Sequence, residues 1–112
     1  MIIKIHETTF FVDLEDNETS RAFCDLLPMK LSMQDLNGNE KYAYLDSPLP
    51  RKPIRIQTIH AGDIMLWQDR CIVVFYKTFS TEYAYTKIGS ITNSYPLKQC
   101  LGTKNVVVQF LK

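Results

Sequence analysis

The sequence predicts one domain of mainly β structure, folded as a closed or nearly closed antiparallel barrel with two short helices. Three observations support this prediction. The chain of 112 residues is long enough for one domain but not for two. Short segments rich in β-branched and aromatic residues recur along its whole length, separated by turn residues. Only two segments have the apolar spacing of a helix, and two short helices would cover the open ends of a barrel.

The N-terminal part of the chain is predicted to form two strands and a helix. The strands are expected over 2–5 and 10–14, where β-branched and aromatic residues flank the polar sequence His-Glu-Thr-Thr. A helix is expected over 18–27, because its apolar residues share one face and acidic residues lie at its start. Pro28 ends this helix, since the residue before a proline avoids the α region.

A β-hairpin is predicted to follow this helix. Apolar and polar residues alternate from Met29 to Met33 and again over 40–45, which is the period of a strand. The turn between them, Asn37-Gly38-Asn39, consists of residues that tolerate positive φ. One face of the second strand would carry Glu40, Tyr42 and Tyr44, and the other face Lys41, Ala43 and Leu45.

The second half of the chain is predicted to contain further strands and one more helix. Strands are expected over 54–59, 64–67, 71–79, 83–91 and 106–111. The proline-rich segment 47–53 is expected to be a loop. A helix is expected over 94–101, with Gly102 as its stop. Residues 71–76 are apolar on both faces, so we expect this strand to contact the core on one side and a second layer on the other.

Composition and charge indicate a cytoplasmic protein without a nucleic-acid or membrane partner. The 13 basic residues nearly balance the 12 acidic ones, and no basic stripe of the kind typical of nucleic-acid binders is present. No apolar run approaches the roughly 20 residues of a membrane helix. The N-terminal residues also lack the layout of a signal peptide.

No motif in the sequence indicates a metal, a cofactor or a catalytic nucleophile. The three cysteines, Cys24, Cys71 and Cys100, have no CxxC spacing, and we expect them to be reduced and buried. His6 and His60 lie in predicted turns and are expected to be exposed. A GxSxG nucleophile elbow, a glycine-rich phosphate loop and a zinc-binding HExxH motif are all missing. We therefore expect no metal and no cofactor.

Several short strings occur in a characteristic order along nearly the whole chain. They are Leu27-Pro28-Met29, Glu40-Lys41-Tyr42, Ala61 to Trp67, Val74-Phe75-Tyr76, Tyr83 to Gly89 and Leu97 to Val107. In this order and spacing the chain resembles the cyclophilin-like fold family of small bacterial and archaeal proteins, whose function is largely undefined. The resemblance implies a cyclophilin-like barrel. Similarity to true cyclophilins, eight-stranded barrels that isomerise peptide bonds before proline, is fainter.

The chain departs from true cyclophilins at the positions that carry their catalysis. Cyclophilins have an arginine in a Phe-His-Arg-type string on the strand after the first helix, and the comparable segment 40–45 has none. Their Gly-Ser-Gln-type approach to the site strand is replaced by the short turn 68–70. Tyr85 falls about where their histidine would lie. No catalytic residue can therefore be carried over to this chain.

A ligand pocket is predicted instead from side chains on neighbouring strands. The candidate ligand-binding residues are Glu40, Tyr42, Arg55, Trp67, Phe75, Tyr76, Tyr83 and Tyr85. Glu40 would accept hydrogen bonds from an amine or amide, and the tyrosines bring an apolar body with a polar tip. Arg55, which alternates with isoleucines in its predicted strand, is the candidate cation. The simpler interpretation is that the aromatic residues are core and Arg55 is a solvated surface charge.

Three functions are compatible with these features. The first is a binding module for a small molecule or a peptide, with or without proline, and without strong isomerase activity. The second is a divergent peptidyl-prolyl isomerase in which Arg55 or another cation replaces the usual arginine. The third is an interaction protein that forms a homo-oligomer, with exposed aromatic residues as interface anchors.

Overall fold

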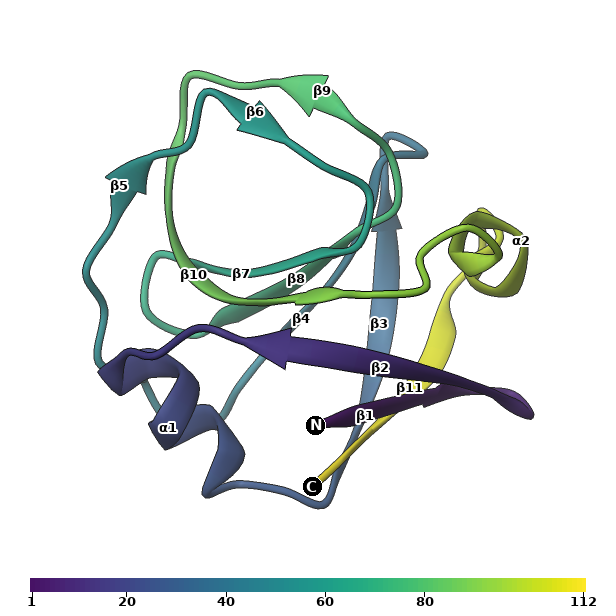
Figure 1. Ribbon diagram of the computed structural model, residues 1–112, viewed down its shortest axis with the longest axis horizontal. Coiled ribbons are helices and arrows are strands. Elements are labelled where there is room, and N and C mark those ends of the chain that lie inside the picture. Colours follow the sequence, from purple (N-terminus) through teal and green to yellow (C-terminus); the bar gives the residue numbers. More distant parts are fainter.

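The computed structural model describes all 112 residues and contains eleven strands and two helices (Figure 1). In chain order the elements are β1 (Ile2–Ile5), β2 (Thr8–Leu14), α1 (Glu18–Cys24), β3 (Met29–Leu36), β4 (Glu40–Tyr44), β5 (Ile54–Arg55), β6 (Thr58–Ile59), β7 (Asp63–Trp67), β8 (Cys71–Phe75), β9 (Phe79–Ser80), β10 (Ala84–Ile91), α2 (Leu97–Leu101) and β11 (Val106–Leu111).

Eight of the strands form an antiparallel barrel. Around the barrel the strands follow the order β2-β1-β11-β3-β4-β8-β7-β10, and β10 pairs with β2 to close it. The predicted fold class is thus confirmed.

Closure of the barrel depends on a close approach of β10 to β2. β10 pairs with β7 on one side and with β2 on the other, and its register with β7 shifts between Lys87 and Gly89. At Gly89, a Cβ atom would lie 2.6 Å from the carbonyl oxygen of Asp13 and 2.9 Å from Cγ1 of Val12. Glycine is therefore needed for the two backbones to meet.

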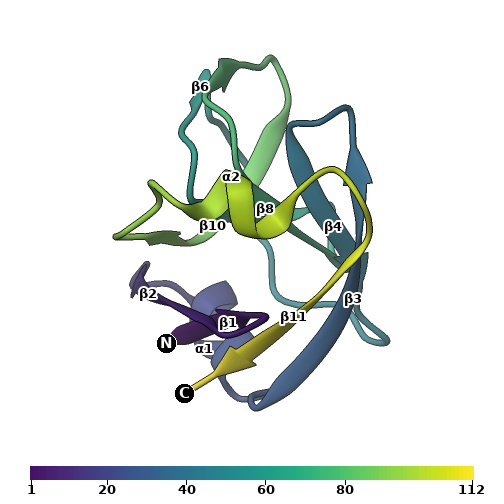
Figure 2. The ribbon, with the colours of Figure 1, turned by 90° about the vertical axis from the view of Figure 1, so that its right-hand side faces the viewer.

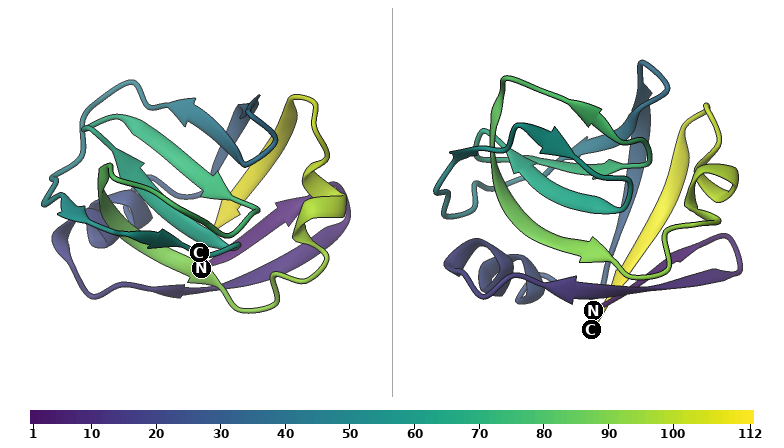
Figure 3. Two further views of the ribbon diagram at one scale, coloured as in Figure 1. Left: turned by 90° about the horizontal axis from the view of Figure 1, so that it is seen from above. Right: turned by 45° about the horizontal axis from the view of Figure 1, so that its top comes forward.

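The interior of the barrel is filled by a cluster of 22 buried apolar residues. All eight barrel strands contribute to it, because alternate residues of each strand point inward. The two helices lie on opposite sides of the barrel (Figures 1 and 3). From α1, Phe23 packs edge-on against Phe110, with 5.4 Å between ring centroids, and α2 adds Leu97 and Leu101.

A charged side chain is also fully buried inside the barrel. Lys41 points inward from β4, and its Nζ lies 3.0 Å from Oδ1 of Asp35 and 2.6 Å from the carbonyl oxygen of Lys104. The phenol of Tyr76 donates a hydrogen bond to the same Asp35 oxygen. Burial raises the pKa of Asp35, but hydrogen bonds from Tyr76, Lys41 and the Gly38 amide outweigh it and hold that pKa below its usual value.

Two of the predicted strands are each divided into two short strands. The segment 54–59 forms β5 and β6, because Gln57 between them has φ of +69°. The segment 71–79 forms β8 and β9, which are separated at residues 76–78. β6 and β9 pair with each other outside the barrel sheet and form an arm that projects from it (Figures 1 and 2).

Both helices are shorter than predicted. Beyond Cys24 the chain continues in tight turns, in which the amides of Leu26 and Leu27 donate to the third residue before each. The second helix begins at Leu97 rather than at residue 94. Neither helix is long and apolar enough to cross a membrane.

The cysteines are less uniform in burial than predicted, whereas the histidines are exposed as predicted. All three thiols are free, and only Cys71 is buried, because it lies on the central strand β8. Cys24 and Cys100 are half-buried at the helix ends. His6 and His60 are exposed in turns.

Substitution of Gly89 tests the closure of the barrel. Gly89→Ala is expected to lower the free energy of unfolding by at least about 2 kcal/mol, because its new methyl group meets backbone that cannot move cheaply. The neighbouring Ser90→Ala, at an exposed position of the same strand, should change it by less than about 0.5 kcal/mol. Urea unfolding followed by circular dichroism measures both, and equal effects of the two variants would contradict the explanation.

Candidate functional site

Two hollows in the surface have volumes of more than about 500 Å³ and could hold a ligand. The first, here named the aromatic pocket, has a volume of about 710 Å³, and the second, the polar cleft, about 520 Å³. The aromatic pocket is lined by Leu36, Asn37, Asn39, Glu40, Tyr42, Tyr44, Trp67, Cys71, Val73, Phe79, Ser80, Thr81, Glu82, Tyr83 and Tyr85. These residues come from the outer face of the barrel, the tip of the β3–β4 hairpin and the projecting arm.

Strand alternation places the floor of the aromatic pocket on the outer face of the barrel. On β8, Ile72 and Val74 belong to the interior cluster, so Cys71 and Val73 point outward. The antiparallel register sets Tyr42 of β4 opposite Val73, and Trp67 of β7 opposite Cys71. Side chains directly opposite each other share one face, so the tyrosine and the tryptophan stand on either side of an apolar floor.

A second buried cluster lies beneath and beside this floor. It consists of Ile59, Met65, Cys71, Val73, Phe75 and Tyr85, with Phe79 packed against it. The arm covers part of the cluster, since the ring of Phe79 lies 5.8 Å from the ring of Phe75. Figure 2 shows the arm and the β3–β4 hairpin rising on the same side of the barrel. The pocket is the space that these two walls leave open over β8.

The aromatic side chains of the pocket form two groups of contacting rings, one on each wall. The ring of Trp67 lies 5.3 Å from the rings of both Tyr83 and Tyr85. On the opposite wall, Tyr42 and Tyr44 pack edge-to-face at 6.1 Å. Such contacts hold the rings in place while much of their surface stays open to a ligand, since Tyr44 and Tyr83 are each 63% exposed.

Glu40 is the group of the pocket that titrates near neutral pH. Burial and the negative charge of Asp35 raise the pKa of Glu40 from 4.5 to about 7. Burial and the charge of Glu40 also raise the pKa of Cys71 to about 11 and that of Tyr85 to about 12. At neutral pH the thiol and this phenol are therefore uncharged, and the carboxyl group exchanges a proton readily.

The structure brings five of the eight predicted ligand-binding residues together. Glu40, Tyr42, Trp67, Tyr83 and Tyr85 all line the aromatic pocket. Their role in binding stays a prediction. The sequence indicated which strand face each residue occupies, and the structure shows that these faces meet in one pocket. They come from β4, β7, β10 and the loop before β10.

The other three predicted residues lie away from the pocket wall. Phe75 is fully buried under Phe79 and forms part of the support below the pocket. Tyr76 follows it, faces the barrel interior and bonds to Asp35 there. Arg55 is exposed on β5, where it pairs with the strand end at Ala84, and does not line the pocket.

Sequence reasoning missed several members of the pocket wall. The alternation on β4 correctly placed Tyr44 on the face of Glu40 and Tyr42, but Tyr44 was not among the eight candidate ligand-binding residues. Phe79 and Glu82 belong to the arm and its return loop. Their position depends on the separation of β9 from β8, and the segment 71–79 has no periodic pattern that would indicate it.

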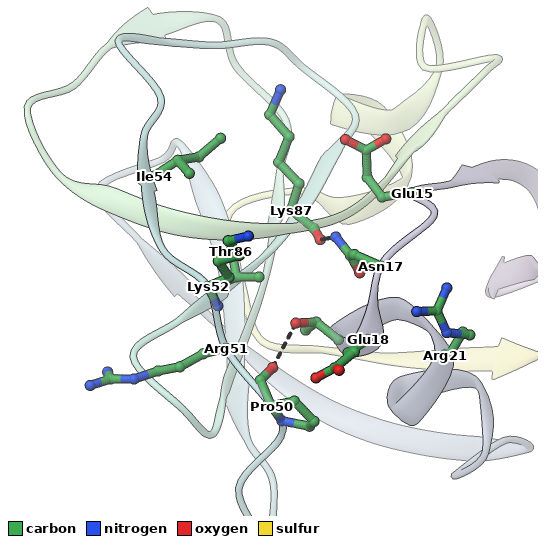
Figure 4. A pocket seen from close by; sticks show the side chains of 11 residues that line it. Glu15, Asn17, Glu18, Arg21, Pro50, Arg51, Lys52, Ile54, Thr86 and Lys87 are labelled. Atoms are coloured by element: carbon green, nitrogen blue, oxygen red, sulfur yellow. Dashed lines mark hydrogen bonds between the residues drawn. The ribbon is translucent and has the colours of Figure 1, made fainter.

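The polar cleft is a seam between structural elements rather than a converging site (Figure 4). Its inward polar groups are bonded to each other: Thr19 donates to the carbonyl oxygen of Pro50, and Asn17 donates to that of Lys87. Figure 4 shows Arg51 and Arg21 on opposite sides of the cleft. No ion pair joins two of the charged residues that line it.

Comparisons with known proteins support the fold but provide no activity. A family model described as the cyclophilin-like family matches residues 3–111. A search among curated proteins found no match. The solution structure of the hypothetical protein AF2241 from Archaeoglobus fulgidus is similar, with a TM-score of 0.60 and 23% sequence identity, over 96% of this chain and 89% of that one. At this identity the structural match supports the shared fold alone.

Substitution of Glu40 is expected to stabilise the protein in a pH-dependent way. Near pH 4 the carboxyl is mostly protonated in the folded and unfolded chains, so Glu40→Gln should change little. Between pH 4.5 and about 7 the unfolded chain releases its proton while the folded chain retains it, so the wild-type free energy of unfolding falls as pH rises. The full difference between the folded and unfolded pKa values of Glu40 corresponds to a loss of at most about 3 kcal/mol in the free energy of unfolding. Solvent in the open pocket screens the carboxylate and reduces this loss to about 1–2 kcal/mol.

Urea titrations at pH 4, 6 and 8 measure this effect. Glu40→Gln should exceed the wild type in stability at pH 8 and equal it near pH 4. Glu7→Gln, in the exposed β1–β2 turn, is the matched control and should follow the wild type throughout. A stability difference that does not depend on pH would contradict the burial of the Glu40 carboxylate.

Two aromatic substitutions separate the support of the pocket from its wall. Phe75→Ala should lower the free energy of unfolding by about 3–5 kcal/mol, because the ring is fully buried. Tyr83→Ala should cost about 1 kcal/mol or less, since that ring is mostly exposed and loses mainly its contact with Trp67. Chemical unfolding followed by circular dichroism gives both values. A small effect of Phe75→Ala would mean that its ring is not core.

Proposed function

This chain belongs to the cyclophilin-like family, and from that premise we propose that it is a binding module, which takes a small molecule or short peptide into the aromatic pocket. The observation that carries the proposal is the pocket itself. A hollow of about 710 Å³ with nine apolar residues among its 15 lining residues has the size and composition typical of ligand sites. Its few polar groups, Glu40 above all, would orient the ligand.

Exposed aromatic rings in this position support a binding role. Tyr44 and Tyr83 expose 63% of their surface beside the half-buried Tyr42 and Trp67, so the apolar surface is contiguous rather than scattered. Contiguous exposed apolar surface on a small protein usually marks a site of interaction. Tyrosine and tryptophan also dominate binding energies, because they present large rigid surfaces with a polar tip.

The side chains of the pocket favour binding over proline isomerisation. Rotation about a peptide bond crosses a barrier of about 18–20 kcal/mol, and a catalyst needs a cation or donor directed at the amide. The lining of the pocket includes two glutamates but no arginine, lysine or histidine. Arg55, the candidate replacement, is exposed on β5 outside the pocket. We therefore place isomerase activity second.

An NMR titration of the full chain with short X-Pro peptides tests the proposal. We expect shifts in the amide signals of Glu40, Trp67, Tyr83 and Tyr85, without faster cis–trans exchange of the peptide in the same tube. Tyr83→Ala should raise the Kd obtained from this titration at least fivefold, because truncation of a hot-spot tyrosine costs more than about 1 kcal/mol of binding free energy. Phe11→Ala is the matched control, since Phe11 is an exposed aromatic on β2 outside the pocket.

The same samples distinguish the alternatives. Accelerated exchange would make the protein an isomerase. A change of molecular mass in light scattering that Tyr44→Ala abolishes would instead identify the pocket as a contact between copies of the chain. If neither X-Pro peptides nor a panel of small apolar and charged fragments shifts the pocket signals, the proposed binding role is wrong.

A further inference from the structure

The charge of the aromatic pocket is of one sign. Two of its lining residues, Glu40 and Glu82, are acidic, and the lining holds no basic side chain. Glu82 is exposed in the loop that follows the arm, whereas Glu40 is half-buried and lies opposite Phe75 across the β4–β8 pair. A negative site with apolar walls attracts ligands of positive charge.

Glu40 has no partner within the protein. It takes part in none of the three ion pairs of the structure, and no side-chain hydrogen bond includes it. Its neighbour Lys41 cannot serve, because successive strand residues point to opposite faces and Lys41 is bonded to Asp35 inside the barrel. A partly buried carboxylate without a partner is costly, and a cationic ligand would remove that cost.

The aromatic rings near Glu40 favour a positive charge as well. The face of an aromatic ring carries a negative electrostatic potential and attracts a cation that lies within about 6 Å of the ring centre. Tyr42 and Tyr44 stand on the same strand face as Glu40, and Trp67 and Tyr85 form the opposite wall. A carboxylate beside several rings, in a cavity without competing cations, combines both kinds of recognition.

We propose that the ligand of the aromatic pocket is an organic cation, with an ammonium or guanidinium group against Glu40 and an apolar body between Tyr42 and Trp67. The proposal rests on the binding role proposed above and names the class of ligand. A free amine and the side chain of a lysine or arginine in a peptide share this chemistry. The experiment below includes both sources.

Trp67 provides the signal for the test, because it is the only tryptophan of the chain and lines the pocket. Its fluorescence is followed at pH 8, where Glu40 is ionised, during titration of the full chain with phenethylamine or with 2-phenylethanol. These probes have the same body, and only the first is positively charged. A second pair is acetyl-Gly-Lys-Gly-amide and its norleucine counterpart.

In each pair we expect the cation to bind about tenfold more tightly than the neutral probe, as a charge-assisted hydrogen bond would give. Glu40→Gln should remove this preference, because it lowers the affinity for the cation about tenfold. Glu7 is exposed and does not line the pocket, so Glu7→Gln should bind all four probes with the affinities of the wild type. The tighter of the two cations identifies the source, peptide or free amine.

Equal affinity for charged and neutral probes would overturn the assignment of a cation, and so would a preference that survives in Glu40→Gln. Either result leaves the pocket as a binding site for another class of ligand. Failure of all four probes to change the fluorescence of Trp67 also overturns the assignment. In that case the NMR titrations with X-Pro peptides and with the fragment panel decide the binding role separately. Shifts of the pocket signals in those titrations would support a binding role, and unchanged signals would contradict it.

Discussion

Burial of both faces of β8 is the constraint on which the rest of the structure depends. Ile72 and Val74 fill the barrel interior, while Val73 and Phe75 form apolar surface on its outside. Apolar surface left in water costs about 25 cal/mol for each Å², so the outer row needs a cover. The arm formed by β6 and β9 supplies it over Phe75 through the ring of Phe79. Val73, which is only 2% exposed, is covered by the side chains around it and lies at the floor of the aromatic pocket.

The alternation of β4 separates two opposite charges that are adjacent in the sequence. Lys41 turns into the barrel, where Asp35, Tyr76 and the carbonyl of Lys104 satisfy it. Glu40 turns outward to the pocket and lies close enough to Asp35 for the two negative charges to interact. Because Lys41 is bonded in the interior, the outer carboxylate has no partner within the protein. The interior ion pair thus contributes to the electrostatic character of the pocket without lining it.

The fold could be predicted largely from local patterns, and the candidate site only in part. Alternation over 40–45 correctly placed Glu40 and Tyr42 on one face of β4, because a period of two identifies the faces of a strand. The segment 71–76 is apolar at every position, so its sequence does not tell which residues face outward. Phe75 and Tyr76 were therefore both included among the pocket residues, although one lies below the pocket and the other inside the barrel.

The sequence by itself determined the class of fold, the positions of most strands along the chain, the presence of two short helices and the resemblance that the family model confirms. These features depend on the spacing of apolar residues, on turn residues and on short strings of adjacent residues, all of which can be read from the sequence without knowing which segments come into contact. Only the tertiary structure decided that β6 and β9 leave the barrel as an arm and that Arg55 lies apart from the pocket. It also decided that Glu40 has no internal partner, because partners are set by contacts between strands far apart in the sequence.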